Sequence, residues 1–318
     1  MNRKNLIIAG AVFVVLLAYV LITQTGNRGF NTVRLPELVK ITADDMERVE
    51  ITRSAGSLVL EKKDKVWRVA VPYAFPAEKY KVENLQRSLA EIRLTDIIAE
   101  QGGREADFGL ASTTATGLRL FGTKNRKLEL TVGKANPAGT HTFVRLPGDV
   151  KVYQVLGELA GALSAPASDW RSLQINDFSP DTVQAFTLTR GSKVLAAAKA
   201  QEPDASAILP AGNTALARPL RTIWRAEREP RALNDPKVNQ WLNAFARLAA
   251  GRIVDNPPAA KVTAQIRVKT PQSEVGLEFL ENPSRGKTYW VRRSGETVVF
   301  EIPEYQGQNL LKDVKDLL

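Results

Sequence analysis

The chain has 318 residues, a formal net charge of +10 and no cysteine, which excludes disulfides, thiol nucleophiles and thiolate metal sites. Apolar residues make up 44% and charged residues 25%, as in ordinary globular domains, so the chain can form a real core and is not a disordered protein. No standard recognition motif for nucleic acid accompanies the basic charge, so we do not expect nucleic acid as a partner.

The first feature in chain order is an apolar run near the N-terminus. Residues 6–22 carry no charge, and as a helix they would span roughly 25 Å, at the short end of what crosses a bilayer. Arg3 and Lys4 precede the run, which predicts a cytoplasmic tail at 1–5, one transmembrane anchor at 6–23 and an extracytoplasmic remainder. No small-x-small cleavage site follows, which favours an uncleaved anchor over a signal peptide.

The remainder of the chain contains an internal sequence repeat of two copies. In each copy a Trp-Arg pair, at Trp67 and at Trp224, leads through a proline-containing segment into an amphipathic stretch. Both stretches have apolar residues at the same 3-4-3 spacing, which is typical of one buried face of a helix. These residues are Val82, Leu85, Leu89 and Ile92 in the first copy, and Val238, Trp241, Phe245 and Leu248 in the second.

Alternating apolar and polar residues around turns predict antiparallel hairpins before and after each helix. The copies end in nearly the same hairpin, FVRLPGDVKVYQV at 143–155 and WVRRSGETVVFEI at 290–302. The earlier hairpins are at 49–63 and 118–132 in the first copy, and at 186–200 and 266–280 in the second. Each copy therefore reads as three strands, a helix, a strand, a meander of about four strands and a final helix.

Together these patterns predict an α+β protein, in which an N-terminal transmembrane helix precedes two tandem copies of a mostly antiparallel β-sheet unit with packed helices. We expect a tether at 24–38, the first copy at 39–165 and the second at 166–318, with a surface loop inserted at about 201–219. The sequence leaves open whether the copies form separate domains or share one sheet.

No motif carries recognisable catalytic chemistry. The stretch RGKT at 285–288 lacks the glycine that a phosphate-binding loop needs five positions before Gly286, where Glu281 stands. Asp107-Phe108-Gly109 stands without the other kinase motifs. The single histidine, His141, cannot build a histidine-based metal site alone. We therefore expect a non-enzymatic protein without catalytic, cofactor-binding or metal-binding residues, and a hydrolase with an unfamiliar site is the open alternative.

The one candidate binding site is a cluster of arginines in the second copy. Arginine binds carboxylates and phosphates through its planar fork, so the cluster could receive such a partner. The alternative is a solvated surface that binds nothing. A binding role requires exposed arginines with few carboxylates nearby in the protein. The cluster consists of Arg218, Arg221, Arg225, Arg228 and Arg231.

The order and spacing of several short motifs resemble those of the domain of unknown function 4340 family. The motifs are Val66-Trp67 leading to Pro72, Asp107-Phe108-Gly109-Leu110, Gly117-Leu118-Arg119-Leu120, Val132-Gly133, and Asp169-Trp170-Arg171-Ser172-Leu173 leading to Asp177-Phe178. None is catalytic, and the family supplies no active site to carry over. The resemblance implies a bacterial protein held at the cytoplasmic membrane with its bulk in the periplasm, often encoded beside ABC transporters of the gliding-motility type.

We therefore predict a membrane-anchored extracytoplasmic accessory or scaffold protein that needs no cofactor and works with ABC-type transporter subunits through protein contacts. The alternative is a module that binds an envelope polyanion or glycan through the arginine cluster. Binding of the second kind would weaken with added salt, because salt screens exposed charges.

Overall fold

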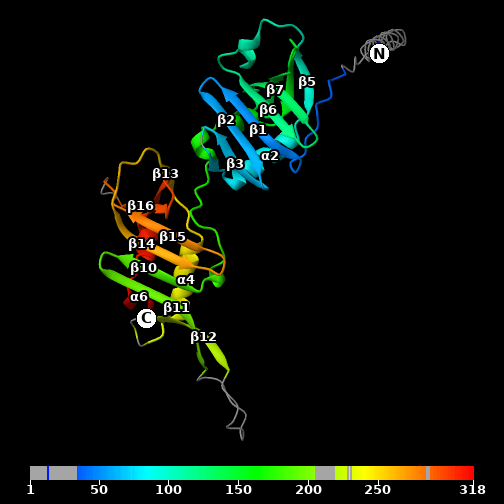
Figure 1. The fold of residues 1–318 in the computed structure, drawn as a ribbon. Coiled ribbons are helices and arrows are strands. Elements are labelled where there is room, and N and C mark those ends of the chain that lie inside the picture. The colour runs from blue at the N-terminus through cyan, green and yellow to red at the C-terminus, as the bar shows by residue number, and fades with distance from the viewer. Residues whose placement is uncertain are drawn as a thin grey trace, which may run out of the picture. The chain divides into compact units, whose positions relative to one another are not determined.

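The computed structural model describes residues 13, 34–72, 74–204, 219–227, 229, 231–283 and 287–318, and Figure 1 traces the fold. The chain divides into two compact units, of which the first ends at Arg171 and the second begins at Ser172. Apart from residue 13, the predicted anchor at 6–23 lies outside the described residues.

The first unit is a nine-stranded antiparallel sheet in the order β4-β3-β2-β1-β6-β7-β8-β9-β5. Its strands are β1 (Met46–Arg53), β2 (Gly56–Lys63), β3 (Val66–Val71), β4 (Phe75–Pro76), β5 (Leu94–Ala99), β6 (Thr116–Gly122), β7 (Arg126–Ala135), β8 (His141–Arg145) and β9 (Val152–Leu156). Its helical elements are α2 (Lys79–Ala90), η1 (Glu105–Phe108), α3 (Leu159–Ser164) and η2 (Ala167–Trp170).

Helix α2 connects the β3–β4 edge of this sheet with β5 at the opposite edge. The Glu78 side chain caps its first turn by accepting a hydrogen bond from the Lys81 N–H. The predicted apolar face is buried at Val82, Leu85 and Leu89, and it forms one core cluster with inward-facing residues of the strands. Helix and sheet therefore share the apolar core of the first unit.

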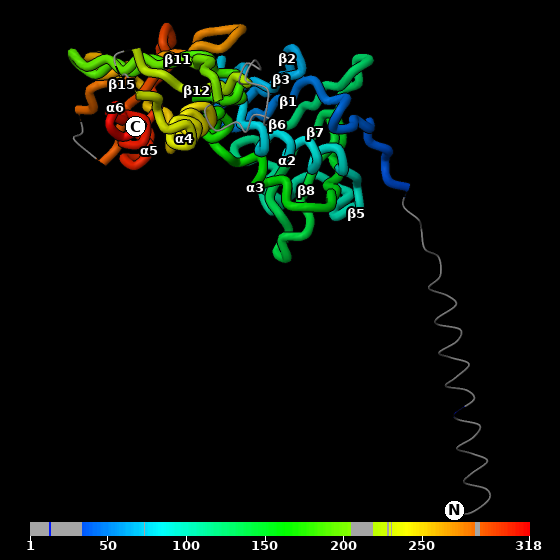
Figure 2. The backbone as a smooth tube through the Cα atoms, turned by 90° about the horizontal axis from the view of Figure 1, so that it is seen from below, coloured from blue at the N-terminus to red at the C-terminus, as the bar shows by residue number. Residues whose placement is uncertain are grey.

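The second unit is an eight-stranded antiparallel sheet in the order β12-β11-β10-β14-β15-β16-β17-β13. Its strands are β10 (Ala185–Arg190), β11 (Lys193–Pro203), β12 (Leu220–Ala226), β13 (Arg252–Val254), β14 (Val262–Lys269), β15 (Glu274–Leu280), β16 (Thr288–Arg293) and β17 (Val299–Pro303). Its helical elements are η3 (Pro180–Thr182), α4 (Asp235–Ala246), α5 (Glu304–Leu310) and α6 (Val314–Leu317). Figure 2 shows α4, α5 and α6 on one side of this sheet.

The two sheets have the same strand order once the two-residue strand β4 is set aside. In both, the third strand along the chain leads into the long helix, and the next strand closes the far edge of the sheet. Leu85 and Trp241 are buried on α2 and α4, and Tyr153 and Phe300 are buried on β9 and β17. The sheets are separate, which answers the question that the sequence left open.

The predicted fold class is wrong. We expected an α+β protein with a transmembrane helix, but the described residues form two antiparallel sheets with few helices, and the longest of these have twelve residues. None of the described helices combines the length and the apolar character needed to cross a bilayer. The helical pattern extends over three turns only in α2 and α4, whereas the final helix of each copy is short or broken into two pieces, as in α5 and α6.

The boundary between the units lies a few residues later than the predicted start of the second copy at 166. Trp170 is 2% exposed and belongs to the core of the first unit. Arg171 forms an isolated antiparallel bridge with Ala77. These contacts fix residues 166–171 to the first unit, although the sequence places them after its last predicted helix.

Tyr153 gives the first unit a specific sensitivity to alkali. Its hydroxyl donates a hydrogen bond of 2.6 Å to the Asp149 carboxylate. Burial, together with Asp149, raises the pKa of Tyr153 to about 12. Because an unfolded tyrosine ionises near pH 10, this stabilisation is fully present below about pH 10 and is lost as the pH rises through about 12.

We therefore expect the denaturant midpoint of the first unit to fall between about pH 10 and pH 12, and the Tyr153→Phe variant to lose that part of the pH dependence. Hydrogen exchange resolved by peptide distinguishes the two units. Phe300, which stands on the corresponding strand of the second unit, has no hydroxyl and provides an internal control. The same alkaline decline in wild type and variant would contradict the role given to Tyr153.

Candidate binding groove in the first unit

A groove of about 870 Å³ lies at the C-terminal end of α2. Residues 35–41, which lead into the first sheet, form one wall, and residues 89–94, at the end of α2 and in the turn after it, form another. Leu120, Leu128 and Leu156 complete the lining. A volume of this size falls within the range of ligand-binding clefts in proteins. We name this site the first-unit groove.

Most residues that line the first-unit groove are apolar, backbone and charged groups are also accessible in it, and its charged side chains balance. Two acidic and two basic residues contribute to it, Glu37, Lys40, Glu91 and Arg93. Val39 is 44% exposed and Leu156 is 47% exposed, so aliphatic side chains are accessible at its surface. A partner of low net charge that offers both apolar side chains and hydrogen-bonding groups fits this lining better than an ionic one.

The wall at residues 35–41 is tied to the sheet at its C-terminal end. Arg126 donates a hydrogen bond of 3.0 Å to the Lys40 carbonyl and forms an ion pair of 2.6 Å with Asp45. Hydrogen bonds from Thr42, Arg126 and Thr123 lower the pKa of Asp45 to about 2, so this ion pair persists down to strongly acidic pH. Among the described residues, no backbone N–H of 34–41 donates to α2.

In the second unit the corresponding place is filled by the chain itself. Residues 173–178, which lead into the second sheet, lie across the C-terminal end of α4. The N–H groups of Ile175 and Asn176 donate to the Leu248 carbonyl at 2.8 and 3.1 Å. The Phe178 N–H donates to the Ala246 carbonyl at 3.3 Å. This segment therefore satisfies the carbonyl of Ala246, the last residue of α4, and that of Leu248 in the turn after the helix.

Two further contacts hold residues 173–178 in place. The Asn176 side-chain amide donates to the Phe245 carbonyl at 3.0 Å, and the Ala250 N–H donates to the Leu173 carbonyl at 2.8 Å. Ile175 is 0% exposed and Asn176 is 2% exposed. The segment is therefore part of the core of the second unit.

The two helix ends correspond residue by residue. The repeated apolar spacing makes Leu89 equivalent to Phe245 and Ile92 equivalent to Leu248. Ala90 is therefore equivalent to Ala246. Each carbonyl that accepts a hydrogen bond from residues 173–178 therefore has a counterpart in the lining of the first-unit groove. The groove is the open form of a place that the second unit fills.

A family model described as Domain of unknown function (DUF4340) matches residues 67–265, which is more than half of the chain. The chain belongs to this family. The resemblance drawn from the short motifs is thereby confirmed. Searches of the curated proteins and of the solved structures find no match. The DUF4340 match includes both helix ends and residues 173–178, whereas residues 35–41 precede it.

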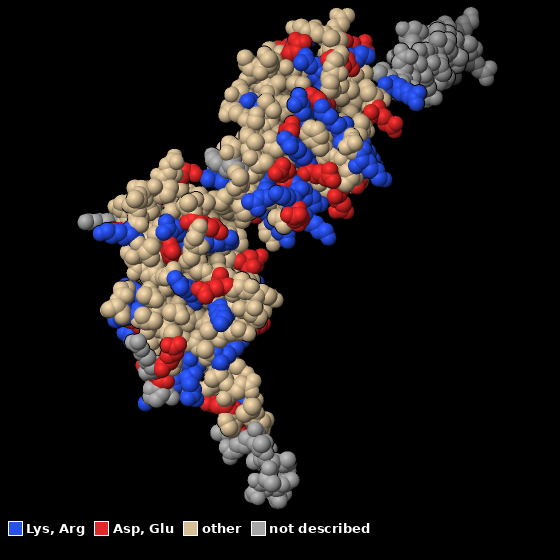
Figure 3. Space-filling model, in the orientation of Figure 1, with Lys and Arg blue, Asp and Glu red and all other residues tan. Residues whose placement is uncertain are grey.

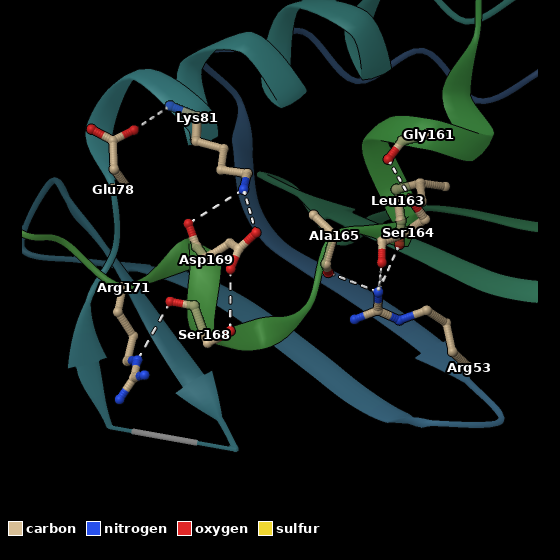
Figure 4. A network of polar contacts seen from close by, with 10 residues as sticks. All are labelled: Arg53, Glu78, Lys81, Gly161, Leu163, Ser164, Ala165, Ser168, Asp169 and Arg171. Carbon is tan, nitrogen blue, oxygen red and sulfur yellow. Dashed lines mark hydrogen bonds and ion pairs between the residues drawn. The ribbon is translucent and has the colours of Figure 1, made fainter. Parts of the chain in front are cut away.

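One of the motifs that carry the DUF4340 resemblance, Asp169-Trp170-Arg171, joins elements of the first unit. The Lys81 ammonium of α2 lies 3.7 Å from the Asp169 carboxylate, and the Trp170 carbonyl accepts a hydrogen bond of 2.8 Å from the Glu78 N–H. The Arg171 Nε donates to the Ser168 carbonyl at 3.4 Å, as Figure 4 shows. Within the structure this motif therefore anchors the end of the first unit to the start of α2.

The same view shows how a strand residue closes helix α3 (Figure 4). One guanidinium nitrogen of Arg53, at the end of β1, donates to the carbonyls of Leu163, Ser164 and Ala165 at 3.1, 2.7 and 2.7 Å. These carbonyls stand at the C-terminal end of α3, where a positive charge is stabilising. Arg53 therefore holds the last helix of the first unit against its sheet.

Asp107-Phe108-Gly109 and His141, which were tested for catalytic or metal chemistry in the sequence, do not line the groove. Phe108 packs edge-on against Phe143 with ring centroids 5.0 Å apart, and Gly109 ends η1 with a φ of +69°. His141 stands at the start of β8 with its Nδ1 2.9 Å from the Thr140 hydroxyl. Within the described ranges, no group of three or more His, Asp or Glu residues could hold a metal ion. The stretch at 285–288 is only partly described.

Two arginines of the cluster predicted as a binding site, Arg221 and Arg225, lie on β12. Arg221 and Arg225 both form ion pairs with Glu202 of β11, at 2.7 and 3.2 Å, and hydrogen bonding to Glu202 raises the pKa of Arg221. Arg231 is exposed after the strand, while Arg218 and Arg228 lie outside the described residues. Two of the five arginines therefore already have a carboxylate partner, and the binding role of the cluster stays a prediction.

We did not predict the first-unit groove from the sequence. Its wall falls largely in the stretch that we predicted to be a tether, where Pro36 interrupts any regular pattern. Leu35 and Leu38 were the available signal, because apolar residues are unusual in a solvated linker. Both pack against the core of the first unit.

Proposed function

We propose that this protein is a non-enzymatic accessory protein that binds a protein partner in the first-unit groove. The observation that carries the proposal is the difference between two otherwise corresponding helix ends. At the end of α4 a chain segment fills the site, whereas at the end of α2 a groove of about 870 Å³ stands open.

A protein partner suits the groove for two reasons. Aliphatic side chains at its surface, Val39 and Leu156, offer apolar area to a partner. The groove also adjoins Leu94, the first residue of β5, and β5 is the edge strand of its sheet. An edge strand presents backbone groups that a further chain can pair with. The groove and the edge together can therefore receive a polypeptide.

The cellular setting is proposed from the sequence. We place the two units on the extracytoplasmic side of a bacterial membrane, and a subunit of an ABC-type transporter is the class of partner that we favour. The apolar run at 6–22, the two positive charges before it and the family resemblance support this setting.

The alternative, a polyanion-binding module, has less support. Glu202 already neutralises part of the charge of Arg221 and Arg225, so an external anion would gain less there. On the face drawn in Figure 3, basic and acidic side chains are interspersed. Such a mixed surface favours solubility over capture of an extended anion.

The Leu156→Lys variant tests the proposed function. A charge at this half-exposed position places an ammonium where a partner would bury apolar surface, so partner capture should fall by about tenfold or more. The measurement is quantitative co-purification from gently solubilised membranes, with thermal unfolding as the check on folding.

Val150→Lys is the matched control, because Val150 is 58% exposed in the same unit and does not line the groove. This variant should capture partner as the wild type does. Unchanged capture by Leu156→Lys, or an equal loss in both variants, would contradict the proposal.

A further inference from the structure

We propose that the first-unit groove takes an extended peptide of the kind that the second unit carries at residues 173–178. Its backbone N–H groups would donate to carbonyls at the end of α2 and in the turn after it, and one aliphatic side chain would take the place that Ile175 has in the second unit. This inference rests on the proposed function and specifies the chemistry of the partner.

The acceptors for such a peptide are present at the end of α2. In α4 the Phe245 carbonyl accepts two hydrogen bonds, from the Leu248 N–H and from the Asn176 side chain. Its counterpart in α2, the Leu89 carbonyl, accepts the equivalent hydrogen bond from the Ile92 N–H at 3.4 Å. The carbonyls of Ala90 and Ile92, which correspond to the remaining acceptors, receive no hydrogen bond from any described residue. A chain laid across this end would satisfy them, as residues 173–178 do in the second unit.

The apolar site for such a peptide is also exposed in the first unit. Leu248 is 3% exposed beneath residues 173–178, whereas its counterpart Ile92 is only half-buried and lines the groove. The same apolar position of the repeated helix is therefore covered in one unit and accessible in the other. Covering Ile92 with an aliphatic side chain would remove apolar surface from water.

The protein's own counterpart of residues 173–178 does not fill the groove. The repeated hairpins align Val49 with Phe186 and Arg53 with Arg190. Extending the same alignment toward the N-terminus makes Leu38 the counterpart of Ile175 and Val39 the counterpart of Asn176. Val39 has no side-chain amide to donate to the Leu89 carbonyl in the way that the Asn176 side chain donates to the Phe245 carbonyl. Arg126 holds the Lys40 carbonyl, and the Gln86 side chain donates to the Ala43 carbonyl at 2.7 Å. The peptide that we propose is a segment of another polypeptide, because this segment of the chain is held by other contacts.

The composition of the peptide follows from the lining. The charged residues of the groove balance, with two of each sign, so the peptide should carry little net charge. An aliphatic residue fills the position of Ile175, and an asparagine or glutamine after it can reach the Leu89 carbonyl. The sequence Ser-Leu-Gln-Ile-Asn-Asp-Phe, residues 172–178 of this chain, has these properties and serves as the probe.

The test is a binding titration of the fluorescent synthetic heptapeptide against the full chain. We expect saturable binding that Leu156→Lys weakens by about tenfold or more and that Val150→Lys leaves unchanged. Methylating the peptide nitrogen at the Ile175 position removes a backbone donor and should weaken binding by about fivefold or more. Methylation at the Asp177 position is the control, because that N–H has no acceptor among the described residues.

Three outcomes would overturn the inference. They are the absence of saturable binding, an equal loss from both methylated peptides, and binding that appears only in a Val39→Lys variant, which would show that the protein's own segment occupies the groove. If the peptide fails to bind while Leu156→Lys still abolishes partner capture, the mode of recognition is wrong and the proposed function stands.

Discussion

The Phe245→Ala variant is expected to lower the free energy of unfolding of the second unit by about 3–5 kcal/mol. The Phe245 ring is 0% exposed. It stacks on Trp241 with centroids 6.0 Å apart and meets Phe178 edge-on at 6.1 Å. Truncation leaves a cavity and also removes the ring against which Phe178 packs, so residues 173–178 should loosen together with the core.

Denaturant unfolding combined with hydrogen exchange measures this effect for each unit. The counterpart variant Leu89→Ala should cost about 2–5 kcal/mol in the first unit and leave the second unit unchanged, because the two sheets have separate cores. A loss below about 1 kcal/mol for Phe245→Ala would exclude it from the core. Equal losses in both units would show that the cores are not separate.

The Arg53→Met variant is expected to destabilise the first unit by about 2–3 kcal/mol, because a hydrogen bond to a charged group is worth more than a neutral one. Methionine keeps an apolar stem but cannot donate to the three carbonyls at the end of α3. Loss of these bonds should detach α3 before the sheet unfolds, which hydrogen exchange at residues 159–164 would detect.

Arg190 is the matched control for Arg53. It occupies the same position in the repeated hairpin, at the end of β10, but its side chain is exposed. Arg190→Met should therefore change stability by no more than about 0.5 kcal/mol. If both variants lose the same stability, the cap on α3 contributes nothing and the effect belongs to the position in the strand.

The helices with clear apolar periodicity could be predicted from the sequence. The one residue of the predicted apolar faces that is not buried lies in the first-unit groove. Val82, Leu85 and Leu89 are buried as their spacing indicates, because one face of an amphipathic helix must meet the sheet. Ile92 and Leu248 hold the same place in that pattern, yet only Leu248 is buried. Periodicity reports which face turns inward, but not whether another segment of the chain covers its end.

The fold class and the arginine cluster show which features local sequence patterns do not predict. The final helices were read from short apolar stretches, and a stretch such as 305–318 gives little sign that the chain breaks into α5 and α6. Glu202 falls at the start of the stretch that we predicted to be an inserted loop, but it lies on β11 opposite Arg221. Strand pairing brings these side chains together, and the local sequence around either residue does not predict that contact.

The most direct test of the central claim is to map where the peptide binds. A photoreactive residue replaces isoleucine in Ser-Leu-Gln-Ile-Asn-Asp-Phe, and mass spectrometry identifies the adducts formed with the full chain. The open groove predicts adducts on residues 89–94 and on Leu120, Leu128 or Leu156 of the first unit. Adducts confined to residues 245–250, where the peptide would have displaced the protein's own segment, would contradict the claim that the first unit holds the vacant site.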